Sequence, residues 1–489
     1  MDFPVVLDSK SKTPVFLQVA RALRERILSG QLKPGSRLPS TREMGETLGI
    51  SRATVVKSYD DLLSQGLIEA TPGGRTCVSR RLRTGAGEDP ARRRATPIAH
   101  ADLDGRISAE SRQMMDLTLS YATSADRPEL NYGSPPLDML PARQWKEVLL
   151  EHCRAQSPAA FDYSPDPFGY PALRESIAGY LSRAKALNCA AEQIVVFPGS
   201  QQALNYTCRL LIDQGDAVVV ENPGYTGARD NFLARGARLV PVDVDEDGLT
   251  VSALYELDRP PKLVYVTPGH HDPSGAIMSL ARRRQLVDWA SRHDVTIVED
   301  AWDGDYRYVS PSLPALQGLD TNGRVIYIYS FWKVLYPLSA VGCLVLPPPL
   351  VPLFERARLL AERQFPMLEH YALNDFIAEG HLERHIKKTR AVYARRRQAL
   401  ISALSRNFRA AVTIPKQSAG LHLTVRFAAE LQGSDIAYLA GQAGLPLTAT
   451  AQYYLHSSRA GEFLIPFALL PEHDIGAAVD RLADLLARH

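Results

Sequence analysis

The chain has 489 residues, enough for two or three domains, and its 45% content of hydrophobic residues is ordinary for a globular protein. No apolar run is long enough to span a bilayer, no export signal precedes the first helix, and the five cysteines are scattered, so we expect a cytoplasmic protein with reduced thiols. Residues 1–80 carry twelve Lys and Arg against eight Asp and Glu, and residues 81–95 add a net charge of +3, whereas the rest of the chain is acidic; this basic front end predicts a polyanionic partner.

Residues 1–80 predict three helices followed by a β-hairpin. The first helix ends at Gly30 and has one apolar face, formed by Phe16, Val19, Ala20, Leu23 and Ile27. The segment STRE, residues 40–43, is a capping box that opens a second helix, which Gly49 breaks. Ser51 caps a third helix, and LIEATPGGRTCVSR gives two strands around a Pro-Gly-Gly turn. This order is typical of a winged helix-turn-helix, a small α+β fold.

A winged helix-turn-helix reads DNA with its third helix, which here begins with short polar and basic side chains suited to base edges and phosphates. The glycines of the hairpin turn let its backbone approach DNA closely. For any single arginine a solvated surface charge is an equally simple interpretation, but the whole arrangement favours double-stranded DNA as the partner. The residues that we expect at the DNA are Arg42, Ser51, Arg52, Thr54, Lys57, Gly74 and Arg75.

Residues 81–115 lack apolar periodicity and are rich in Arg, Ala, Gly and Pro, so we interpret them as a flexible basic linker. Their run of three arginines, residues 92–94, could contact DNA, but a solvated charge run is the commoner explanation. From residue 116 to 489, apolar β-rich runs alternate with helical stretches, which predicts an α/β domain with a mainly parallel sheet wrapped by helices. Ligands bind such sheets beyond the carboxyl ends of the strands.

The residues that follow the predicted strands form a set suited to pyridoxal phosphate. An acid that can hold a pyridinium nitrogen, Asp300, and an amine that can form an imine, Lys333, each follow a strand. Tyr225 offers an aromatic face, and Gly199-Ser200-Gln201 opens a helix whose free N–H groups favour a phosphate. Each residue alone has a simpler explanation, since Asp300 could cap a helix and Lys333 could be an exposed loop lysine.

The segment GQLKPGSRLPSTREMGETLGISRATVVKSYDDLLSQGLIEATPGG resembles the DNA-binding domains of the GntR family. Together with DYSPDPFGYPALRESIAGYL, VENPGYTGARDNF, VTPGHHDPSGAIMSLARRRQL and IVEDAWDGDYRY, it makes nearly the whole chain similar to the MocR branch of that family. In that branch a winged helix-turn-helix is tethered to a fold-type-I aminotransferase-like domain with a smaller C-terminal α+β subdomain. The resemblance implies a homodimeric transcription regulator that binds an operator and uses pyridoxal phosphate, often with an amino compound as effector.

The resemblance also adds site residues. The 33-residue spacing from Asp300 to Lys333 fits the family's acid-to-lysine spacing. Ser330 agrees with the family loop around the lysine, and His271 and Trp302 occupy positions next to the cofactor. We therefore expect Lys333, Asp300, Tyr225, Gly199, Ser200, Gln201, Ser330, His271 and Trp302 to line a pyridoxal-phosphate site. The adjacent His270, His271 and Asp272 would seldom point at one ion, so no metal site is predicted.

Several positions depart from the family pattern. Trp332 replaces a small serine before the lysine, and Ala340 replaces the arginine that binds the cofactor phosphate. Trp302 stands where the family has a tyrosine, and Leu464 aligns with the arginine that would clamp a substrate carboxylate. Asp272 is a new acid. These changes predict weakened pyridoxal-phosphate binding, no transamination of ordinary amino acids, and an apolar or uncharged effector. The alternatives are an active aminotransferase and a regulator whose aminotransferase-like scaffold binds no ligand.

Overall fold

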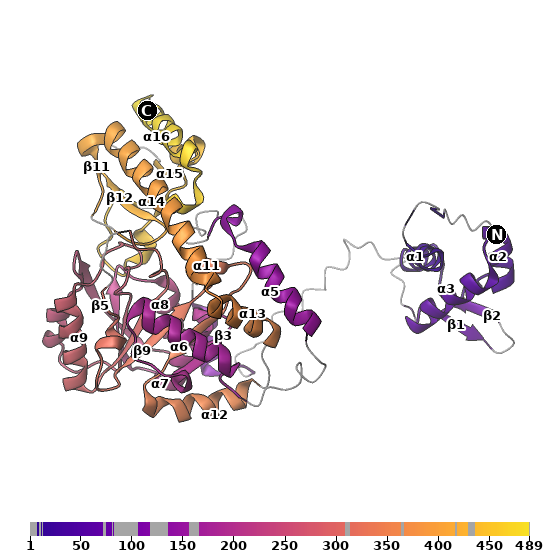
Figure 1. Cartoon of the computed structure of the whole chain (residues 1–489), viewed down its shortest axis with the longest axis horizontal. Coiled ribbons are helices and arrows are strands. Elements are labelled where there is room, and N and C mark those ends of the chain that lie inside the picture. The colour runs from indigo at the N-terminus through magenta and orange to yellow at the C-terminus, as the bar shows by residue number, and fades with distance from the viewer. Residues whose placement is uncertain are drawn as a thin grey trace. The chain divides into compact units, whose positions relative to one another are not determined.

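The structure is a computed structural model, and it describes residues 7–8, 11, 13–71, 75–80, 82, 106–117, 135–155, 166–308, 313–362, 366–415, 418–428 and 436–488. The chain divides into two compact units, Met1–Ile107 and Ser108–His489, and each is considered by itself (Figure 1). Among the described residues, no helix combines the length and apolar character needed to cross a membrane. Nor do these ranges contain a group of three or more His, Cys, Asp or Glu side chains that could hold a metal ion.

The first unit has the predicted winged helix-turn-helix order: α1 (Val15–Leu28), α2 (Thr41–Leu48), α3 (Arg52–Ser64) and the antiparallel strands β1 (Ile68–Thr71) and β2 (Arg75–Val78). The capping box is confirmed, because the Ser40 hydroxyl accepts from the Glu43 N–H and the Glu43 carboxylate accepts from the Ser40 N–H. Gly49 ends α2 with a φ of 65°, a left-handed conformation that glycine adopts without strain.

The apolar face predicted for α1 packs on α3 and forms the core of this unit. Two hydrogen bonds from α3 lock the arrangement: the Tyr59 hydroxyl donates to the Pro39 carbonyl at 2.8 Å, and the Ser58 hydroxyl donates to the Phe16 carbonyl at 2.8 Å. The buried residues are Val19, Ala20, Leu23, Ile27, Leu38, Met44, Val55, Tyr59, Leu62, Leu67, Ile68 and Val78.

An eight-stranded sheet organises the second unit, in the order β3-β10-β9-β8-β7-β4-β5-β6. Five neighbouring strands, from β9 to β5, run parallel, whereas β10 is antiparallel to β9 and β3, and β6 is antiparallel to β5. The strands are β3 (Ile194–Phe197), β4 (Ala217–Asn222), β5 (Arg238–Asp245), β6 (Gly248–Leu249), β7 (Leu263–Val266), β8 (Thr296–Ala301), β9 (Val325–Ser330) and β10 (Gly342–Val345). The mainly parallel sheet is therefore confirmed.

Helices cover both faces of this sheet, because successive strand residues point to opposite sides and both sides are apolar. On one side, inward residues of β3, β4 and β7 pack with α7, α8 and α12; on the other, Val219, Val264 and Ile297 pack with α9. In chain order, the α-helices of this unit before α14 are α4 (Ala109–Asp116), α5 (Ala142–Ala155), α6 (Pro171–Lys185), α7 (Ser200–Leu211), α8 (Thr226–Ala234), α9 (Leu280–His293), α10 (Leu316–Leu319), α11 (Trp332–Leu335), α12 (Val351–Ala361) and α13 (Met367–Ala378).

A smaller α+β subdomain completes the unit. The 28-residue helix α14 (His381–Phe408) runs from the large sheet to a four-stranded antiparallel sheet of order β11-β12-β14-β13 (Figure 1). Its strands and remaining helices are β11 (Val412–Thr413), β12 (Leu423–Phe427), β13 (Thr448–Ala449), β14 (Glu462–Ile465), α15 (Ile436–Ala443) and α16 (Glu472–Arg488). This is the subdomain expected at the C-terminal end.

The structure differs from the predicted linker at its C-terminal end. Residues 81 and 83–105 lie outside the described residues, but Ala109–Asp116 form α4, which contacts α8 of the second unit. The Gln113 amide donates to the Leu233 carbonyl at 2.8 Å, and Glu110 pairs with Arg235 at 2.6 Å. Sequence periodicity missed this helix because its eight residues have no buried side chain.

Candidate functional site

The carboxyl ends of the parallel strands bring most of the predicted site residues to one edge of the sheet. Asp300 lies in β8, whose register pairs it with Ile328 of β9, and β9 ends two residues before α11, which carries Lys333. Gly199 follows β3 and caps α7, and Tyr225 follows β4 and precedes α8. The arrangement is a direct consequence of parallel pairing, which places the ends of neighbouring strands together.

Lys333 is half-buried between two indoles. Its Nζ lies 4.8 Å from the centre of the Trp302 ring and 4.6 Å from that of Trp332. Burial lowers the pKa of Lys333 to about 8, although the carboxylates of Asp303, Asp272 and Asp300 oppose this change. The amine is therefore poised to lose its proton near neutral pH, as an amine that attacks a carbonyl must.

Asp300 is buried, and its two carboxylate oxygens differ. Oδ2 accepts a hydrogen bond of 2.7 Å from the Tyr265 hydroxyl, whereas Oδ1 is buried and has no hydrogen-bond partner among the described residues. Burial raises the pKa of Asp300 to about 7, opposed by the Tyr265 hydrogen bond. A buried acceptor with no partner costs free energy, and a ring N–H brought beside it would supply the missing bond.

Two glycines, Gly199 and Gly342, let β10 pass close to the start of α7. Gly199 has a φ of 140°, and a Cβ added at Gly342 of β10 would lie 2.8 Å from the backbone nitrogen of Ser200. Only glycine at residue 342 lets β10 pass this closely beside the start of α7. The N–H groups of that first turn have no partner within the helix, which is the property that favours a phosphate.

Gln201 and Tyr225 contact each other. The Gln201 amide donates to the Tyr225 hydroxyl, and its carbonyl accepts from Asn231 at 3.0 Å. A Cβ at Gly227 would lie 2.6 Å from the Gln201 amide nitrogen, so a glycine is required beneath this pair. The contact fixes the Tyr225 ring beside the start of α7.

The DNA-binding candidates lie on the first unit. Arg52 and Lys57 are exposed on α3, and Arg42 is exposed on α2, where it pairs with Glu46 at 3.1 Å. Ser51 caps α3 by accepting from the Thr54 N–H at 3.1 Å, and the two hydroxyls contact each other at 2.8 Å, so both residues also shape the helix start. Gly74 and the side chain of Arg75 lie outside the described residues.

Comparisons with known proteins agree with these two units. The family described as bacterial regulatory proteins, gntR family, matches residues 16–78, and the family described as aminotransferase class I and II matches residues 129–482. The chain is 35% identical to the probable rhizopine catabolism regulatory protein MocR of Rhizobium meliloti, over 93% of this chain and 90% of the relative. The chain belongs to the MocR branch of the GntR family of transcription regulators.

Further relatives support this membership. The pyridoxine biosynthesis transcriptional regulator PdxR of Corynebacterium glutamicum is 29% identical over 82% of each chain. Among solved structures, a Pyrococcus horikoshii kynurenine aminotransferase in complex with PMP has a TM-score of 0.70 and 25% identity, covering 79% of this chain and 98% of the other. The fold-type-I aminotransferase architecture of the second unit is thus confirmed.

The phosphate side of the site carries no basic side chain at the position where the resemblance predicts an arginine. Here Ala340 directs its backbone N–H to the carboxylate of Glu369 at 3.4 Å, and the neighbouring Ser339 hydroxyl donates to the same oxygen at 2.8 Å. The Ala340 carbonyl lies 3.5 Å from the position that a Cβ of Gly199 would take. The Glu369 carboxylate is therefore held by the backbone segment that passes beside Gly199.

The structure gives three predicted residues roles within the chain. Both ring nitrogens of His271 are engaged, Nε2 with the Pro223 carbonyl at 3.0 Å and Nδ1 with the Ser274 hydroxyl at 2.7 Å, and burial lowers the pKa of His271 to about 3. Ser330 accepts from the Trp332 N–H at 3.2 Å. The Trp302 indole N–H donates to the His270 carbonyl at 2.8 Å.

Sequence reasoning missed a buried group beside Lys333. His270 Nδ1 lies 2.8 Å from Asp303 Oδ2, and the rings of His270 and His422 lie against the Trp302 indole, with centroids 5.4 and 5.8 Å from it. Tyr265, which holds Asp300, was also missed. Tyr265 carried a usable signal, because it alternates with Val264 and Val266 in β7 and so faces the side opposite to them. The His270–Asp303 pair joins two loops that are 33 residues apart, which spacing alone does not reveal.

Proposed function

We propose that this MocR-type regulator binds operator DNA through its first unit and that pyridoxal phosphate at Lys333 and Asp300 makes this binding responsive to a small molecule. The observation that carries the proposal is that the Oδ1 oxygen of Asp300 has no hydrogen-bond partner among the described residues. It is buried beside a half-buried amine whose pKa is lowered to about 8, and no described residue satisfies it. Tyr265 fixes the carboxylate so that the open oxygen keeps its direction.

The described residues fit the pyridine-ring half of the cofactor. When bound, pyridoxal phosphate supplies an aldehyde that condenses with amines and a ring that withdraws electrons. Asp300 would accept the ring N–H, Tyr225 would cover a ring face, and Lys333 would provide the amine. The first turn of α7 would donate its N–H groups to the phosphate oxygens.

The phosphate half supports weaker binding than in other members of the branch. A charged bidentate contact contributes roughly 1.5–3 kcal/mol, and Ala340 cannot make one. Its loss corresponds to an affinity about tenfold to a few hundredfold lower. Glu369, which accepts from Ser339 and Ala340, gives this segment an acidic group and no basic one.

The substrate side argues against steady transamination. Leu464 is fully buried and packs with Tyr453 and Trp302 in a small apolar cluster, at the position where a carboxylate-binding arginine is expected. A bound α-carboxylate would face this cluster, and burying an unpaired charge costs several kcal/mol. The pocket favours an uncharged or apolar effector, and we propose that two copies of the chain bind an operator with two half-sites.

The absorbance of the purified full chain with added pyridoxal phosphate tests the cofactor proposal. A visible band is expected in the wild type, is lost in Lys333→Ala, and is weakened in Asp300→Asn. Lys388→Ala, which changes an exposed lysine of α14, is the matched control and should keep the band. A band of equal strength in Lys333→Ala would show that the site is not the one proposed.

An active aminotransferase is the second candidate, favoured by 26% identity to aromatic-amino-acid aminotransferase 1 of Thermococcus litoralis over 92% of that enzyme. The two functions separate in a turnover assay with saturating pyridoxal phosphate, a panel of L-amino acids and 2-oxoglutarate. We expect keto-acid formation of no more than about one equivalent per chain. Sustained turnover that disappears in Lys333→Ala would make the chain an enzyme as well.

A further inference from the structure

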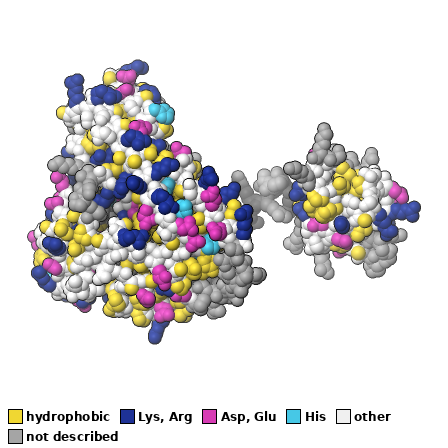
Figure 2. All heavy atoms as spheres, viewed as in Figure 1, with side chains coloured by type: hydrophobic (Ala, Val, Ile, Leu, Met, Phe, Trp, Pro, Cys, Tyr) yellow, Lys and Arg dark blue, Asp and Glu magenta, His cyan; other side chains and the backbone are white. Residues whose placement is uncertain are grey.

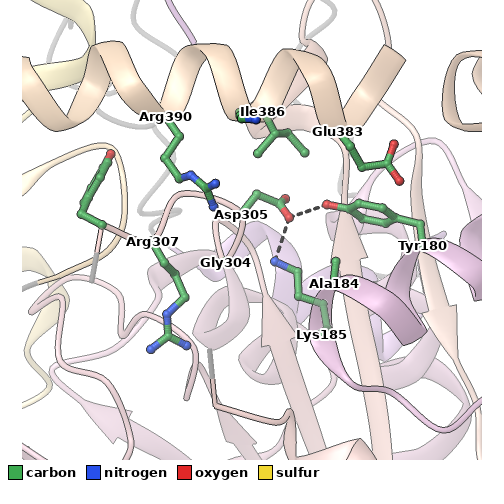
Figure 3. A pocket seen from close by; sticks show the side chains of 11 residues that line it. Tyr180, Ala184, Lys185, Gly304, Asp305, Arg307, Glu383, Ile386 and Arg390 are labelled. Atoms are coloured by element: carbon green, nitrogen blue, oxygen red, sulfur yellow. Dashed lines mark hydrogen bonds and ion pairs between the residues drawn. The ribbon is translucent and has the colours of Figure 1, made fainter. Parts of the chain in front are cut away.

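A cationic cleft lies between α6, the segment after β8, and the first half of α14 (Figure 3). Its volume is about 660 Å³, within the range of small-molecule sites. Neither Lys333 nor the residues described around it line this cleft. The lining residues whose side chains carry charge or can form hydrogen bonds are Tyr180, Lys185, Asp305, Arg307, Tyr308, Glu383, Lys387 and Arg390.

One acid in the cleft is already fully engaged. Asp305 Oδ1 pairs with Lys185 Nζ at 2.7 Å and accepts from the Tyr180 hydroxyl at 2.6 Å, while Oδ2 accepts from the Tyr329 hydroxyl at 2.6 Å. Burial alone would raise the pKa of Asp305, but Lys185 and the two hydroxyls hold it below its usual value. Asp305 and Lys185 therefore neutralise each other and form a fixed floor (Figure 3).

Three further cations line the cleft. Within the described ranges, Arg307, Lys387 and Arg390 form no ion pair, and the buried Nε of Arg307 has no hydrogen-bond partner. The other acid of the cleft, Glu383, is already paired with Arg183 at 3.0 Å. Burial also lowers the pKa of Arg307, which shows that its charge is partly removed from water. An anion in the cleft would find positive charge on two of its sides, from Arg307 after β8 and from Lys387 and Arg390 on α14.

We propose that this cleft binds a small oxyanion, a molecule carrying phosphate or carboxylate groups, at a second effector site. Guanidinium groups match the planar oxygens of such anions in paired hydrogen bonds. Arg390 reaches from α14 toward Gly304 and Asp305, so a bound anion would bridge the helix and the segment after β8 (Figure 3). Lys and Arg side chains also gather over the middle of the second unit, in the area of α14 (Figure 2). The cleft is limited in size and has the Glu383 carboxylate among its walls, which favours a small anion over the extended backbone of a nucleic acid.

The cleft is connected to the surroundings of Lys333 through the chain itself. Arg307 forms a β-bridge with Ala419, and the Gly420 N–H donates to the Tyr306 carbonyl at 2.8 Å. Gly420 in turn packs directly against the His270 ring, because a Cβ on Gly420 would lie 2.1 Å from that ring. An anion held by Arg307 would therefore stabilise the loop that carries Trp302 and Asp303. Binding in the cleft itself does not depend on whether Lys333 holds a cofactor.

Calorimetric titration of the full chain with pyrophosphate and with citrate, at constant ionic strength set by sodium chloride, tests the proposal. We expect saturable binding of at least one probe, weakened about tenfold or more by Lys387→Gln combined with Arg390→Gln. Lys388→Gln removes one exposed positive charge from the same helix but does not line the cleft, so it should leave the dissociation constant unchanged. Arg307→Gln gives a second measurement from the opposite wall, and thermal melting checks that each variant folds.

Three outcomes would overturn the proposal. The first is that neither probe binds saturably to the folded wild type, which would show that the cleft lacks the proposed affinity. The second is that the double variant binds a probe as tightly as Lys388→Gln does, which would place the anion elsewhere. The third is that the wild type binds neither probe while the double variant loses affinity for a non-specific DNA duplex, which would make the cleft part of the DNA-binding surface.

Discussion

Replacing Asp303 by asparagine is expected to lower the pH at which Lys333 reacts with an aldehyde. Burial lowers the pKa of Lys333 from 10.5 to about 8, and Asp303 is the largest of the influences that oppose this change. Asparagine has nearly the same shape as aspartate, so Asp303→Asn removes the charge while leaving an amide oxygen beside His270. Without that charge the protonated amine is less favoured, and the pKa falls further.

The expected size follows from the values above. With a pKa of about 8, roughly 10% of Lys333 is neutral at pH 7, compared with about 0.03% for an ordinary lysine. One nearby carboxylate typically shifts a pKa by on the order of 1 unit, so the variant should react several times faster at pH 7 and no faster well above pH 8.

Trapping with pyridoxal and borohydride measures this difference directly. Pyridoxal lacks the phosphate, so the changes around Ala340 do not enter. Mass spectrometry of the peptide containing Lys333 gives the rate of modification at each pH, and Asp288→Asn, an exposed carboxylate on α9, is the matched control. A wild-type midpoint near pH 10 would refute the argument that burial depresses this pKa. Equal profiles for the wild type and Asp303→Asn would refute the role given to Asp303.

The remaining predictions concern stability, DNA and packing. Burial raises the pKa of Glu221 to about 8, so the folded state keeps a proton that the unfolded state loses from about pH 4.5 upward. Relative to the wild type, Glu221→Gln should therefore gain about 1.4 kcal/mol of stability per pH unit between pH 4.5 and about pH 8. Urea unfolding measures this difference, and stability curves that run parallel for the two proteins would contradict it. Arg52→Ala should weaken binding to an in vitro-selected operator by about 1–3 kcal/mol in fluorescence anisotropy, while Arg21→Ala on α1 should not. Gly342→Ala should cost about 1–3 kcal/mol of stability and reduce the visible absorbance with pyridoxal phosphate, because its Cβ would force the start of α7 to move; an unchanged melting temperature and spectrum would contradict this.

Much of this architecture could be predicted from the sequence because its signals are local. The capping box at Ser40, the turn at Gly49 and the apolar runs of the strands each depend on a few neighbouring residues, and all are confirmed. The placement of Asp300 and Lys333 at one sheet edge follows from parallel pairing, which the alternating pattern predicts. Short, mostly exposed elements such as α4 carry no such signal.

The detailed contacts could not be predicted, because they depend on how distant segments meet. The resemblance predicts His271 next to the cofactor, yet the chain already engages both of its ring nitrogens through Pro223 and Ser274. Glu369 comes from α13, and nothing near Ala340 in the sequence announces it. A missing arginine is visible in a sequence, but the group that occupies its surroundings is visible only in the fold.

Folding stability explains the contact of only one of the two carboxylate oxygens of Asp300, and this is the strongest argument that the site binds a ligand. The bond from Tyr265 satisfies Oδ2, so replacing either residue would leave a buried polar group unpaired at a cost of about 1–3 kcal/mol. The fold alone would therefore retain that pair. It gives no reason for the open Oδ1, because an acid with a pKa raised to about 7 and an unsatisfied buried oxygen lowers stability. A ligand that donates a hydrogen bond to Oδ1 removes this cost, and Lys333 lies close enough to Asp300 for their charges to interact.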